Sequence, residues 1–469
     1  MKIALVAHGY PPELVGGTES AVRSLAHGLV GHGHEVVVVA GTLRYEDGFR
    51  RSLESDAVPG QPGRAVRVHK IHRADLYFDH WQKSASARAS LAFRDILREE
   101  GPDLVHVHHW IRLSRDLVHR AALERIPAVV TLHDLWTTCL VTFRVRPESG
   151  EFCEAKLGPS PCIKCAAQVP PRTPWLGFET QGIALLERSA DLARELDLAR
   201  AVVCPTRAHA DAVARYLGLA PERLNLCVVP HGRELALRRR APPPAPGASG
   251  QLVLGAWGHL YRLKGADRLL RAVRRLRDPA RVRLHFAGGE PEPAFAREVH
   301  ELARGLDVRF HGPYPAAELD AHPVASAHAF VSGTLAHESW GLVLDEAVAL
   351  GLPLVLPRSG AYAERLREGE GALFYDPGSE ASLAAALARL LDEPGLLERL
   401  RATLPDPRRF IPDLQHDVRA HLEVYERVRA AGPPLDARAV PERERIWQAG
   451  EDAWGTALQR CTAEELGFT

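Results

Sequence analysis

The chain has 469 residues, of which 46% are hydrophobic and 25% charged, and this is the composition of a globular protein with enough material for two domains. Basic and acidic residues balance at 59 each, so the formal net charge of zero argues against a general nucleic-acid-binding protein. No apolar run is long enough for a transmembrane helix, and the opening residues are too soon interrupted by Gly and Pro for a signal peptide. We therefore expect a cytoplasmic protein whose seven cysteines are thiols or metal ligands.

The first half of the chain alternates short apolar runs with helical patterns. Residues 3–7 predict the first strand, and residues 19–30 predict the first helix. Further strands are predicted at residues 35–40, 104–107, 128–132, 201–204 and 225–229. Because these runs are apolar throughout, we predict a parallel sheet that helices cover on both faces.

Gly16 and Gly17 lie in the loop that leads into the first predicted helix. Adjacent glycines let the backbone approach a ligand closely, and the free N–H groups at a helix start attract an anion. Tight turns also use glycine pairs, so the pair alone is weak evidence for a binding site.

Three histidines lie where predicted strands end. His106 and His108 fall on one face of the strand at residues 104–107, and His133 follows the strand at residues 128–132. Any single histidine is more often a packing or surface residue than a functional one.

A loop-rich insertion at about residues 137–170 contains four cysteines. Cys139, Cys153, Cys162 and Cys165 are separated by thirteen, eight and two residues. Their number fits a structural zinc site with four cysteine ligands, although the spacing matches no standard zinc finger. An iron–sulfur cluster and unrelated buried thiols are the alternatives. The remaining cysteines are interpreted as packing thiols, and they are Cys204, Cys227 and Cys461.

A Pro-rich linker at residues 238–250 separates a first domain, residues 1–237, from a second domain at residues 251–411. Helices are predicted for residues 412–469. Strands of the second domain are predicted at residues 252–254, 282–286, 308–310, 329–331 and 354–356. We therefore predict two doubly wound α/β domains facing each other across a ligand-binding cleft.

The loop after the first strand of the second domain is basic. It carries His259, Arg262 and Lys264, and a lysine ammonium suits a diphosphate. The helix predicted at residues 267–277 is rich in arginine. Its arginines are interpreted as a solvated face, with contact to anionic lipid head groups as the alternative.

Two glutamates flank a helix start in the second domain. Glu338 lies in the loop after a predicted strand, and Glu346 lies inside the helix predicted at residues 342–350. The N–H groups of Gly341 and Leu342 attract an anion, while carboxylates accept hydrogen bonds from hydroxyls. A nucleotide sugar offers both kinds of group, although spacing alone favours a helix cap or a solvated face.

The segment Glu338-Ser-Trp-Gly-Leu-Val-Leu-Asp-Glu346 resembles the donor site of the retaining family-4 glycosyltransferases, which have the two-domain GT-B fold. Five segments in the expected order extend the resemblance over nearly the whole chain. It implies transfer of a sugar from a nucleoside diphosphate to a hydroxyl acceptor with retention of anomeric configuration. Glu338 would approach the hydroxyls of the sugar, and Glu346 would bind the ribose.

The resemblance also implies that the last helices, in residues 412–469, cross back to the first domain, and it implies roles for the other candidates as well. Gly16 and Gly17 would lie on the donor-diphosphate or acceptor side, and His133 would reach the reacting centre, with His108 as a weaker candidate. Gly341 and Leu342 would hold the phosphate through their N–H groups. In the basic loop, Lys264 matches the family pattern, whereas His259 stands where the family has an arginine. Arg262 is a candidate to take the place of that arginine.

The implied enzyme needs no catalytic metal, and the leaving phosphate helps to deprotonate the acceptor. The acceptor is left open among a glycan, a lipid-linked glycan and a small molecule, with a pocket expected from variable loops at residues 43–79 and from the cysteine insertion. Peripheral contact with the inner face of the membrane is a further option. His259 keeps open a catalytically weak sugar-nucleotide-binding or assembly subunit, and an epimerase or phosphorylase on the same fold is the third alternative.

Overall fold

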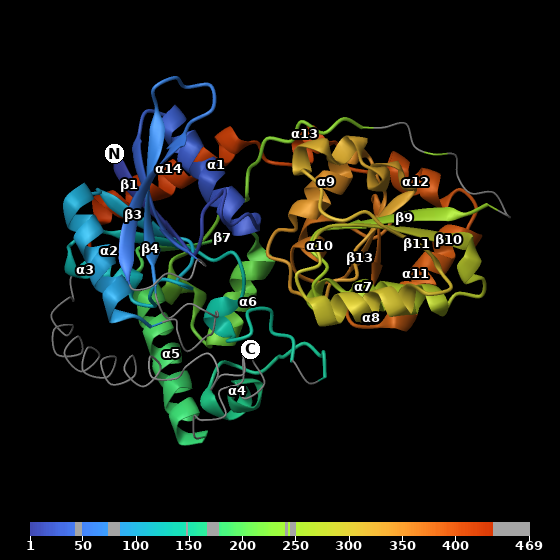
Figure 1. The fold of residues 1–469 in the computed structure, drawn as a ribbon, viewed down its shortest axis with the longest axis horizontal. Coiled ribbons are helices and arrows are strands. Elements are labelled where there is room, and N and C mark those ends of the chain that lie inside the picture. Colours follow the sequence, from blue (N-terminus) through green and yellow to red (C-terminus); the bar gives the residue numbers. More distant parts are fainter. Residues whose placement is uncertain are drawn as a thin grey trace. The chain divides into compact units, whose positions relative to one another are not determined.

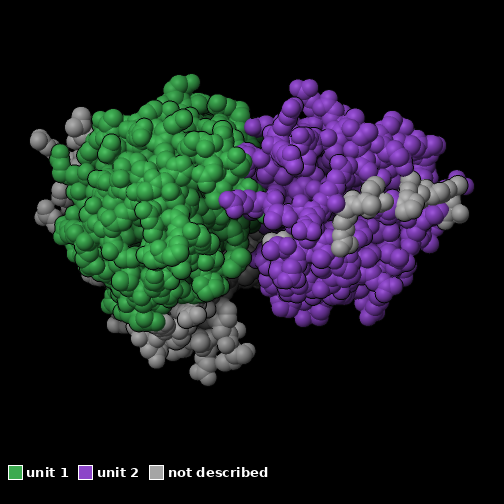
Figure 2. All heavy atoms as spheres, turned by 90° about the horizontal axis from the view of Figure 1, so that it is seen from above, with its two compact units in different colours: residues 1–233, 413–469 green, residues 234–412 purple. Residues whose placement is uncertain are grey.

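The chain folds into two compact units. Unit 1 comprises Met1–Arg233 with the segment that begins at Asp413, and unit 2 comprises Glu234–Pro412 (Figure 2). Each unit contains one β-sheet with helices on both faces (Figure 1). The computed structural model describes residues 1–42, 49–73, 85–146, 149–166, 178–239, 243 and 250–434. Most of the predicted linker and Cys461 lie outside these ranges.

The described sheet of unit 1 has eight strands in the order β3-β4-β2-β1-β5-β6-β7-β8. All neighbouring strands are parallel except β3 and β4. The strands are β1 (Lys2–Ala7), β2 (Glu35–Gly41), β3 (Arg50–Ala57), β4 (Ala65–His72), β5 (Leu104–Val107), β6 (Ala128–Thr131), β7 (Ala201–Cys204) and β8 (Leu226–Val228).

Helices cover both faces of this sheet because its strands are apolar on both sides. In β1, Ala4 and Val6 belong to one buried layer, and Ile3 and Leu5 belong to the opposite one. Strands buried on both faces give continuous apolar runs, which is why the strand at residues 3–7 is predicted correctly. The helices of unit 1 are α1 (Gly17–Gly31), α2 (Ala87–Glu100), α3 (Leu117–Leu123), α4 (Pro159–Ala166), α5 (Phe178–Leu198), α6 (Arg207–Leu217) and α14 (Leu414–Ala431), with the short 3₁₀ helices η2 (Trp136–Thr138) and η3 (Pro221–Leu224).

Helix α14 belongs to unit 1 although it follows unit 2 in the sequence. It packs closely on α1, where a Cβ atom on Gly28 would collide with Val418. Tyr425 of α14 is fully buried, and its hydroxyl lies 2.7 Å from Nδ1 of His106 in β5. The late segment of the chain therefore completes the core of unit 1.

Unit 2 contains a parallel sheet in the order β11-β10-β9-β12-β13-β14. Its strands are β9 (Leu252–Trp257), β10 (Val282–Ala287), β11 (Asp307–Phe310), β12 (Ala329–Val331), β13 (Leu354–Pro357) and β14 (Ala372–Tyr375). Its helices are α7 (Ala266–Arg274), α8 (Pro293–Ala303), α9 (Leu342–Leu350), α10 (Gly360–Arg365), α11 (Glu380–Asp392), α12 (Leu396–Ala402) and α13 (Pro407–Phe410), with the 3₁₀ helices η4 (Arg262–Lys264), η5 (Pro279–Arg281), η6 (Ala316–Ala321) and η7 (Pro323–Ser326).

The core of unit 2 also has two layers. In β12, Ala329 and Val331 pack into the layer that contains residues of α7 and α11. Phe330 points to the opposite layer, which contains residues of α9. This alternation positions the loop after β12 beside the start of α9, where the two candidate glutamates lie.

The prediction of a variable loop over residues 43–79 is wrong for its central part. There, β3 and β4 form an antiparallel pair, and β4 joins the sheet beside β2. β3 is an edge strand with many exposed side chains, so it lacks the apolar run that marks the buried strands. Residues 43–48 and 74–79 lie outside the described ranges.

The interpretation of the α7 arginines as a solvated face is incomplete. Two of these arginines also form ion pairs and hydrogen bonds within unit 2. Arg271 pairs with Asp267 and Glu298, and Arg274 donates to the carbonyl oxygens of Leu302 and Arg304. Contact with a lipid surface stays a prediction. In the part of the chain that is described, none of the helices is long and apolar enough to cross a membrane.

Candidate functional site

A pocket in unit 2 brings together residues from three separate segments. His259 and Lys264 come from the loop after β9, and Glu338 comes from the loop after β12. Val343 of α9 and Tyr362 of α10 also line the pocket. Because β9 and β12 are neighbouring parallel strands, the loops after them leave the same edge of the sheet. This edge is where ligands bind in open α/β sheets.

Glu338 and Lys264 form an ion pair inside this pocket. Nζ of Lys264 lies 2.6 Å from Oε1 of Glu338, and the hydroxyl of Thr334 donates to the same oxygen at 3.1 Å. The Glu338 side chain is 15% exposed, whereas that of Lys264 is 42% exposed. The carboxylate is therefore held by its surroundings, while the ammonium is free to move on its long chain.

Glu346 is buried in α9 and bound by an indole. Nε1 of Trp257, the last residue of β9, donates to Oε2 of Glu346 at 2.9 Å. Trp257 lines the pocket, so Glu346 lies directly behind one of its walls. Sequence reasoning missed Trp257, Thr334 and Tyr362, since nothing in the local pattern distinguishes them from ordinary core or loop residues.

The start of α9 depends on glycine. Gly341 precedes Leu342 with φ at +80°, a left-handed conformation that favours glycine. A Cβ atom on Gly341 would also lie 2.5 Å from Cε1 of Tyr362. Both the turn and the space therefore require glycine at this position.

Arg262 is not among the residues that line the pocket in the described chain. Its guanidinium pairs with Glu298 of α8 and packs over the ring of Phe295. His259 does line the pocket. Lys264 and His259 are thus the basic side chains at this site among the described lining residues, and Arg262 faces a neighbouring helix instead.

Unit 1 gathers histidines at the ends of β5 and β6. Nδ1 of His108 and Nε2 of His133 lie 2.9 Å apart, so a proton is shared between these rings. The ring of His133 also stacks on that of His231 at 5.1 Å. Burial, reinforced by neighbouring histidines, lowers the pKa of both His108 and His133 well below its usual value. Both imidazoles are therefore neutral at physiological pH.

Gly16 and Gly17 form the start of α1, where an internal carboxylate already lies. A Cβ atom on Gly16 would be 2.6 Å from Oε2 of Glu19, and Glu19 pairs with Nε2 of His8 at 2.8 Å. Burial is the largest influence and acts to raise the pKa of Glu19, but the hydrogen bond and charge of His8, a backbone hydrogen bond and the charge of Arg112 together lower it. The anion that this helix start contacts in the structure is therefore the Glu19 side chain.

Comparison with known proteins defines the family. Residues 15–237 match the sequence profile of Glycosyltransferase Family 4, and residues 251–393 match that of the Glycosyl transferases group 1. The D-inositol 3-phosphate glycosyltransferase 1 of Catenulispora acidiphila is 30% identical over 327 residues, which cover 66% of this chain and 68% of that protein. The chain belongs to the group 1 glycosyltransferases.

Two further relatives are named D-inositol 3-phosphate glycosyltransferase. The Acidothermus cellulolyticus protein is 29% identical over 449 residues, or 87% of either chain. The Corynebacterium efficiens protein is 29% identical over 304 residues, which cover 62% of this glycosyltransferase and 63% of the relative.

Solved structures share the fold of this glycosyltransferase. Sucrose-phosphate synthase from Thermosynechococcus elongatus superposes with a TM-score of 0.64 at 19% identity, covering 92% of this chain and 99% of that one. Anabaena HepE in complex with UDP and glucose gives a TM-score of 0.60 at 17% identity, covering 91% of this chain and all of the other. The predicted GT-B fold class, with two Rossmann-like α/β domains, is confirmed.

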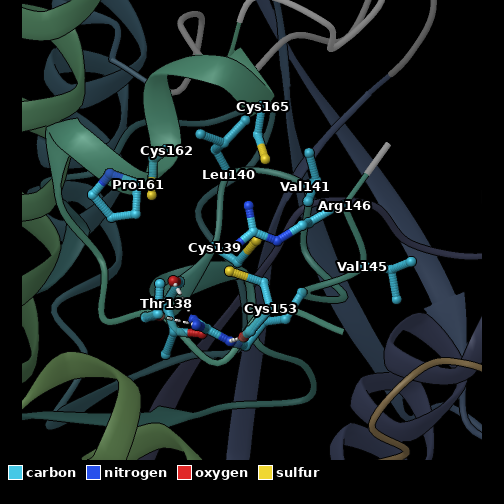
Figure 3. Close-up of a pocket in the computed structure, with 12 residues that line it drawn as sticks. Thr138, Cys139, Leu140, Val141, Val145, Arg146, Cys153, Pro161, Cys162 and Cys165 are labelled. Carbon is cyan, nitrogen blue, oxygen red and sulfur yellow. Dashed lines mark hydrogen bonds between the residues drawn. The ribbon is translucent and has the colours of Figure 1, made fainter. Parts of the chain in front are cut away.

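The four cysteines of the insertion line one small pocket in unit 1 (Figure 3). All four are free of disulfide bonds. Burial raises the pKa of the Cys165 thiol to about 11, and the other three thiols add to this rise. In their present arrangement, no group of three or more His, Cys, Asp or Glu side chains among the described residues is placed to hold a metal ion.

Proposed function

We propose that this glycosyltransferase moves a sugar from a nucleoside-diphosphate donor to a hydroxyl acceptor with retention of anomeric configuration. The observation that carries the proposal is the Lys264–Glu338 pair, 2.6 Å apart in a pocket beside the start of α9. A cation, a carboxylate and the N–H groups of a helix start together match the diphosphate and the hydroxyls of a nucleotide sugar.

Donor binding would separate this ion pair. A half-exposed pair of this kind is worth about 0–1 kcal/mol, so exchanging the carboxylate for a diphosphate is favourable for Lys264. Glu338 stays in place because Thr334 holds its Oε1. Its carboxylate then accepts hydrogen bonds from the sugar hydroxyls.

Glu346 is proposed to bind the ribose of the donor. Trp257 binds Oε2 of this buried carboxylate, and a hydrogen bond from an indole fixes its rotamer. A carboxylate fixed in this way accepts hydrogen bonds from the two ribose hydroxyls with little loss of side-chain entropy.

The reaction breaks the bond between the sugar C1 and the diphosphate oxygen and forms a bond from C1 to the acceptor oxygen on the same face. The acceptor proton passes to the departing phosphate. Lys264 and the N–H groups of Gly341 and Leu342 stabilise the charge of the leaving group, so the step needs no metal. His133, neutral and bound to His108, is proposed to orient a hydroxyl during transfer.

Known relatives guide the choice of substrates. Anabaena HepE was solved with UDP and with UDP-glucose, so UDP-sugars are the first donors to test. Several relatives are named for D-inositol 3-phosphate, so phosphorylated polyols are the first acceptors to test. The proposal includes a cytoplasmic location, with peripheral contact with the inner face of the membrane as a further option.

The test combines a donor screen with product analysis. A panel of UDP-, ADP- and GDP-sugars is screened by thermal shift, and the stabilising donor is then incubated with acceptors. NMR of the product reports the anomeric configuration, and an α-configured donor should give an α-linked product. A product with inverted configuration would overturn retention. Conversion of the sugar nucleotide without transfer to an acceptor would show a different enzyme on the same fold.

A catalytically weak binding or assembly subunit is the second candidate, and His259 is the observation that favours it. His259 occupies the pocket position where the family pattern has an arginine, and Arg262 is turned toward Glu298. The variant His259→Arg separates the two candidates. A large gain in turnover with little activity in the parent protein would favour the binding subunit, and ready turnover by the parent would exclude it.

A further inference from the structure

Three segments of unit 1 bring four thiols to one pocket. Cys139 directly follows η2, Cys153 directly follows the bridge between Val145 and Phe152, and Cys162 and Cys165 lie one turn apart in α4. Figure 3 shows the four side chains around the pocket that they line. Residues three apart share one face of a helix, so the last two thiols approach the pocket together.

Arg144 fixes the backbone around these thiols. Its guanidinium donates to the carbonyl oxygens of Thr138, Cys153 and Ala155, which lie beside two of the four cysteines. The same guanidinium packs 3.6 Å from the centre of the Tyr216 ring. The frame that carries the thiols is therefore built by buried contacts.

Arg188 is an unusual neighbour of this pocket. It is fully buried, and its Nε and Nη1 atoms have no hydrogen-bond partner. Its remaining nitrogen donates to the carbonyl oxygen of Trp136. Its charge interacts with Cys139 and Cys162, and also with Arg115 and Asp134. A fully buried cation is stable only if negative charge lies near it. The carboxylate of Asp134 acts on Arg188 through its charge, but the two unpartnered nitrogens receive no hydrogen bond from it.

We propose that Cys139, Cys153, Cys162 and Cys165 bind one structural zinc ion. Binding converts four thiols to thiolates and releases four protons, so the zinc centre carries a net charge of −2. Arg188 and Arg146, which lines the pocket, lie where they neutralise this charge. The proposal thus explains why a buried arginine with two unpartnered nitrogens lies beside the cysteines.

The size of the cavity favours zinc over an iron–sulfur cluster. Its volume is about 20 Å³, and a single water molecule needs roughly 10–15 Å³ on the same measure. One ion fits this space, whereas a cluster with several irons and sulfides does not. The thiols of the described chain are not placed around an ion in their present arrangement. Zinc binding would therefore require the side chains and their loop to move until each Zn–S distance is about 2.3 Å.

The proposed zinc ion would anchor the loop that follows β6. This loop begins with His133 and Asp134, and the N–H of Trp136 donates to Oδ1 of Asp134 at 2.8 Å. Cys139 follows η2 directly. The ion would therefore hold the segment next to His133 in place. It would affect activity only by fixing the position of this loop.

The test is the metal content of the full-length protein, purified in metal-depleted buffer without a histidine tag. Elemental analysis should find one zinc per chain. The variants Cys153→Ser and Cys165→Ser should each lose it almost completely. Cys227→Ser is the matched control, because Cys227 lies in β8 away from this pocket, and it should keep one zinc.

Cobalt provides a readout on the unaltered protein that does not depend on the folding of any variant. The protein is stripped of metal with a chelator, and added Co²⁺ should give the visible absorption of tetrahedral thiolate coordination at one equivalent. No zinc in the purified protein together with no cobalt absorption would overturn the proposal. Retention of zinc in both serine variants would also overturn it. Finding iron and inorganic sulfide in the purified protein would overturn zinc in favour of an iron–sulfur cluster.

Discussion

Glu338 occupies a position in which its charge is stabilised before any donor binds. Lys264 lies 2.6 Å away and Thr334 donates to the same carboxylate oxygen. These contacts hold the carboxylate in a fixed position at the pocket. The residue is thus prepared to accept hydrogen bonds from a sugar.

Replacement of Glu338 by glutamine should lower kcat/KM by about 10²–10³-fold, as for other groups that stabilise a transition state directly. The amide keeps the size of the side chain but loses its charge and one acceptor position. Steady-state kinetics with the donor identified by the screen measure the effect. Glu370→Gln is the control, since Glu370 is exposed outside the pocket, and an equal loss there would contradict the role of Glu338.

Gly341→Ala should destabilise unit 2 by about 2–4 kcal/mol. The left-handed backbone accounts for about 1–2 kcal/mol, and the remainder comes from the Cβ atom placed 2.5 Å from the Tyr362 ring. Denaturant unfolding measures the change in free energy. Donor affinity should also fall, because the N–H groups at the start of α9 lose their orientation.

Gly369→Ala isolates the backbone effect. Gly369 has φ at +81°, and a Cβ atom there has no heavy atom within 4 Å. The Gly369→Ala variant should therefore lose only the backbone contribution to the free energy of unfolding. Equal costs for the two variants would show that the Tyr362 contact does not constrain the helix start.

At the scale of elements, the edge formed by β5 and β6 concentrates neutral histidines. Strand alternation puts His106 and His108 on one side of β5, and their ring centroids lie 4.0 Å apart. His133 follows β6, which pairs with β5. Burial is the first cause of the lowered pKa of all three, and the nearby histidines add to it. The other titratable groups that contribute are His8, His109, His231 and His421.

These histidines should make stability fall in acid. Their pKa in the folded chain lies below the value of 6.5 for an unperturbed imidazole. Below pH 6.5 the unfolded chain binds protons that the folded chain does not, so stability is complete above pH 6.5 and decreases as pH falls toward the lowered pKa values. Each histidine contributes about 1.4 kcal/mol per pH unit in that window.

The measurement is the free energy of unfolding between pH 5 and pH 7.5 for the parent protein and for His108→Gln. The variant should show a slope smaller by up to about 1.4 kcal/mol per pH unit. The exposed His300 gives the matched control His300→Gln. An unchanged slope in His108→Gln would show that His108 binds a proton as readily in the folded protein as in the unfolded chain.

At the scale of the whole molecule, the sequence predicts the strands that form continuous apolar runs, but it misses β4, which lies inside the sheet of unit 1. Residues 3–7 and 329–331 are apolar on both faces, so a continuous run marks them. β3 escaped prediction because it is an edge strand with a polar sequence, Arg-Arg-Ser-Leu-Glu-Ser-Asp-Ala. Its pairing with β4 depends on register across the sheet, which no local pattern shows.

The candidate site was predictable only where a motif lies within one segment. Glu338 and Glu346 belong to a single stretch and carry the resemblance to the family. The hydrogen bond from Trp257 to Glu346 joins residues 89 positions apart, and it exists because β9 and β12 are neighbours in the sheet. The orientation of Arg262 toward Glu298 likewise depends on the packing of α8, so its candidate role in the pocket could not be judged from the sequence.

Each unit should respond to its own ligand, which hydrogen-exchange mass spectrometry of the full-length protein can resolve. UDP should slow exchange in peptides of unit 2 that contain Lys264, Glu338 and the start of α9, because a ligand at 100 times its Kd stabilises its site by about 2.7 kcal/mol. A zinc chelator should speed exchange in unit 1 over the segment from Cys139 to Cys165. The chelator should leave the peptides around Glu338 unchanged, since the core layers of unit 2 contain none of the cysteines.

The variant Lys264→Ala should reduce the UDP effect without changing the chelator effect, and Cys165→Ser should do the opposite. These two variants test the ligand sites separately in one chain, because the side chains belong to different compact units. Protection by UDP confined to unit 1 would contradict the assignment of the donor pocket. Exchange over Cys139 to Cys165 that is insensitive to the chelator would contradict the zinc site while leaving the donor pocket intact.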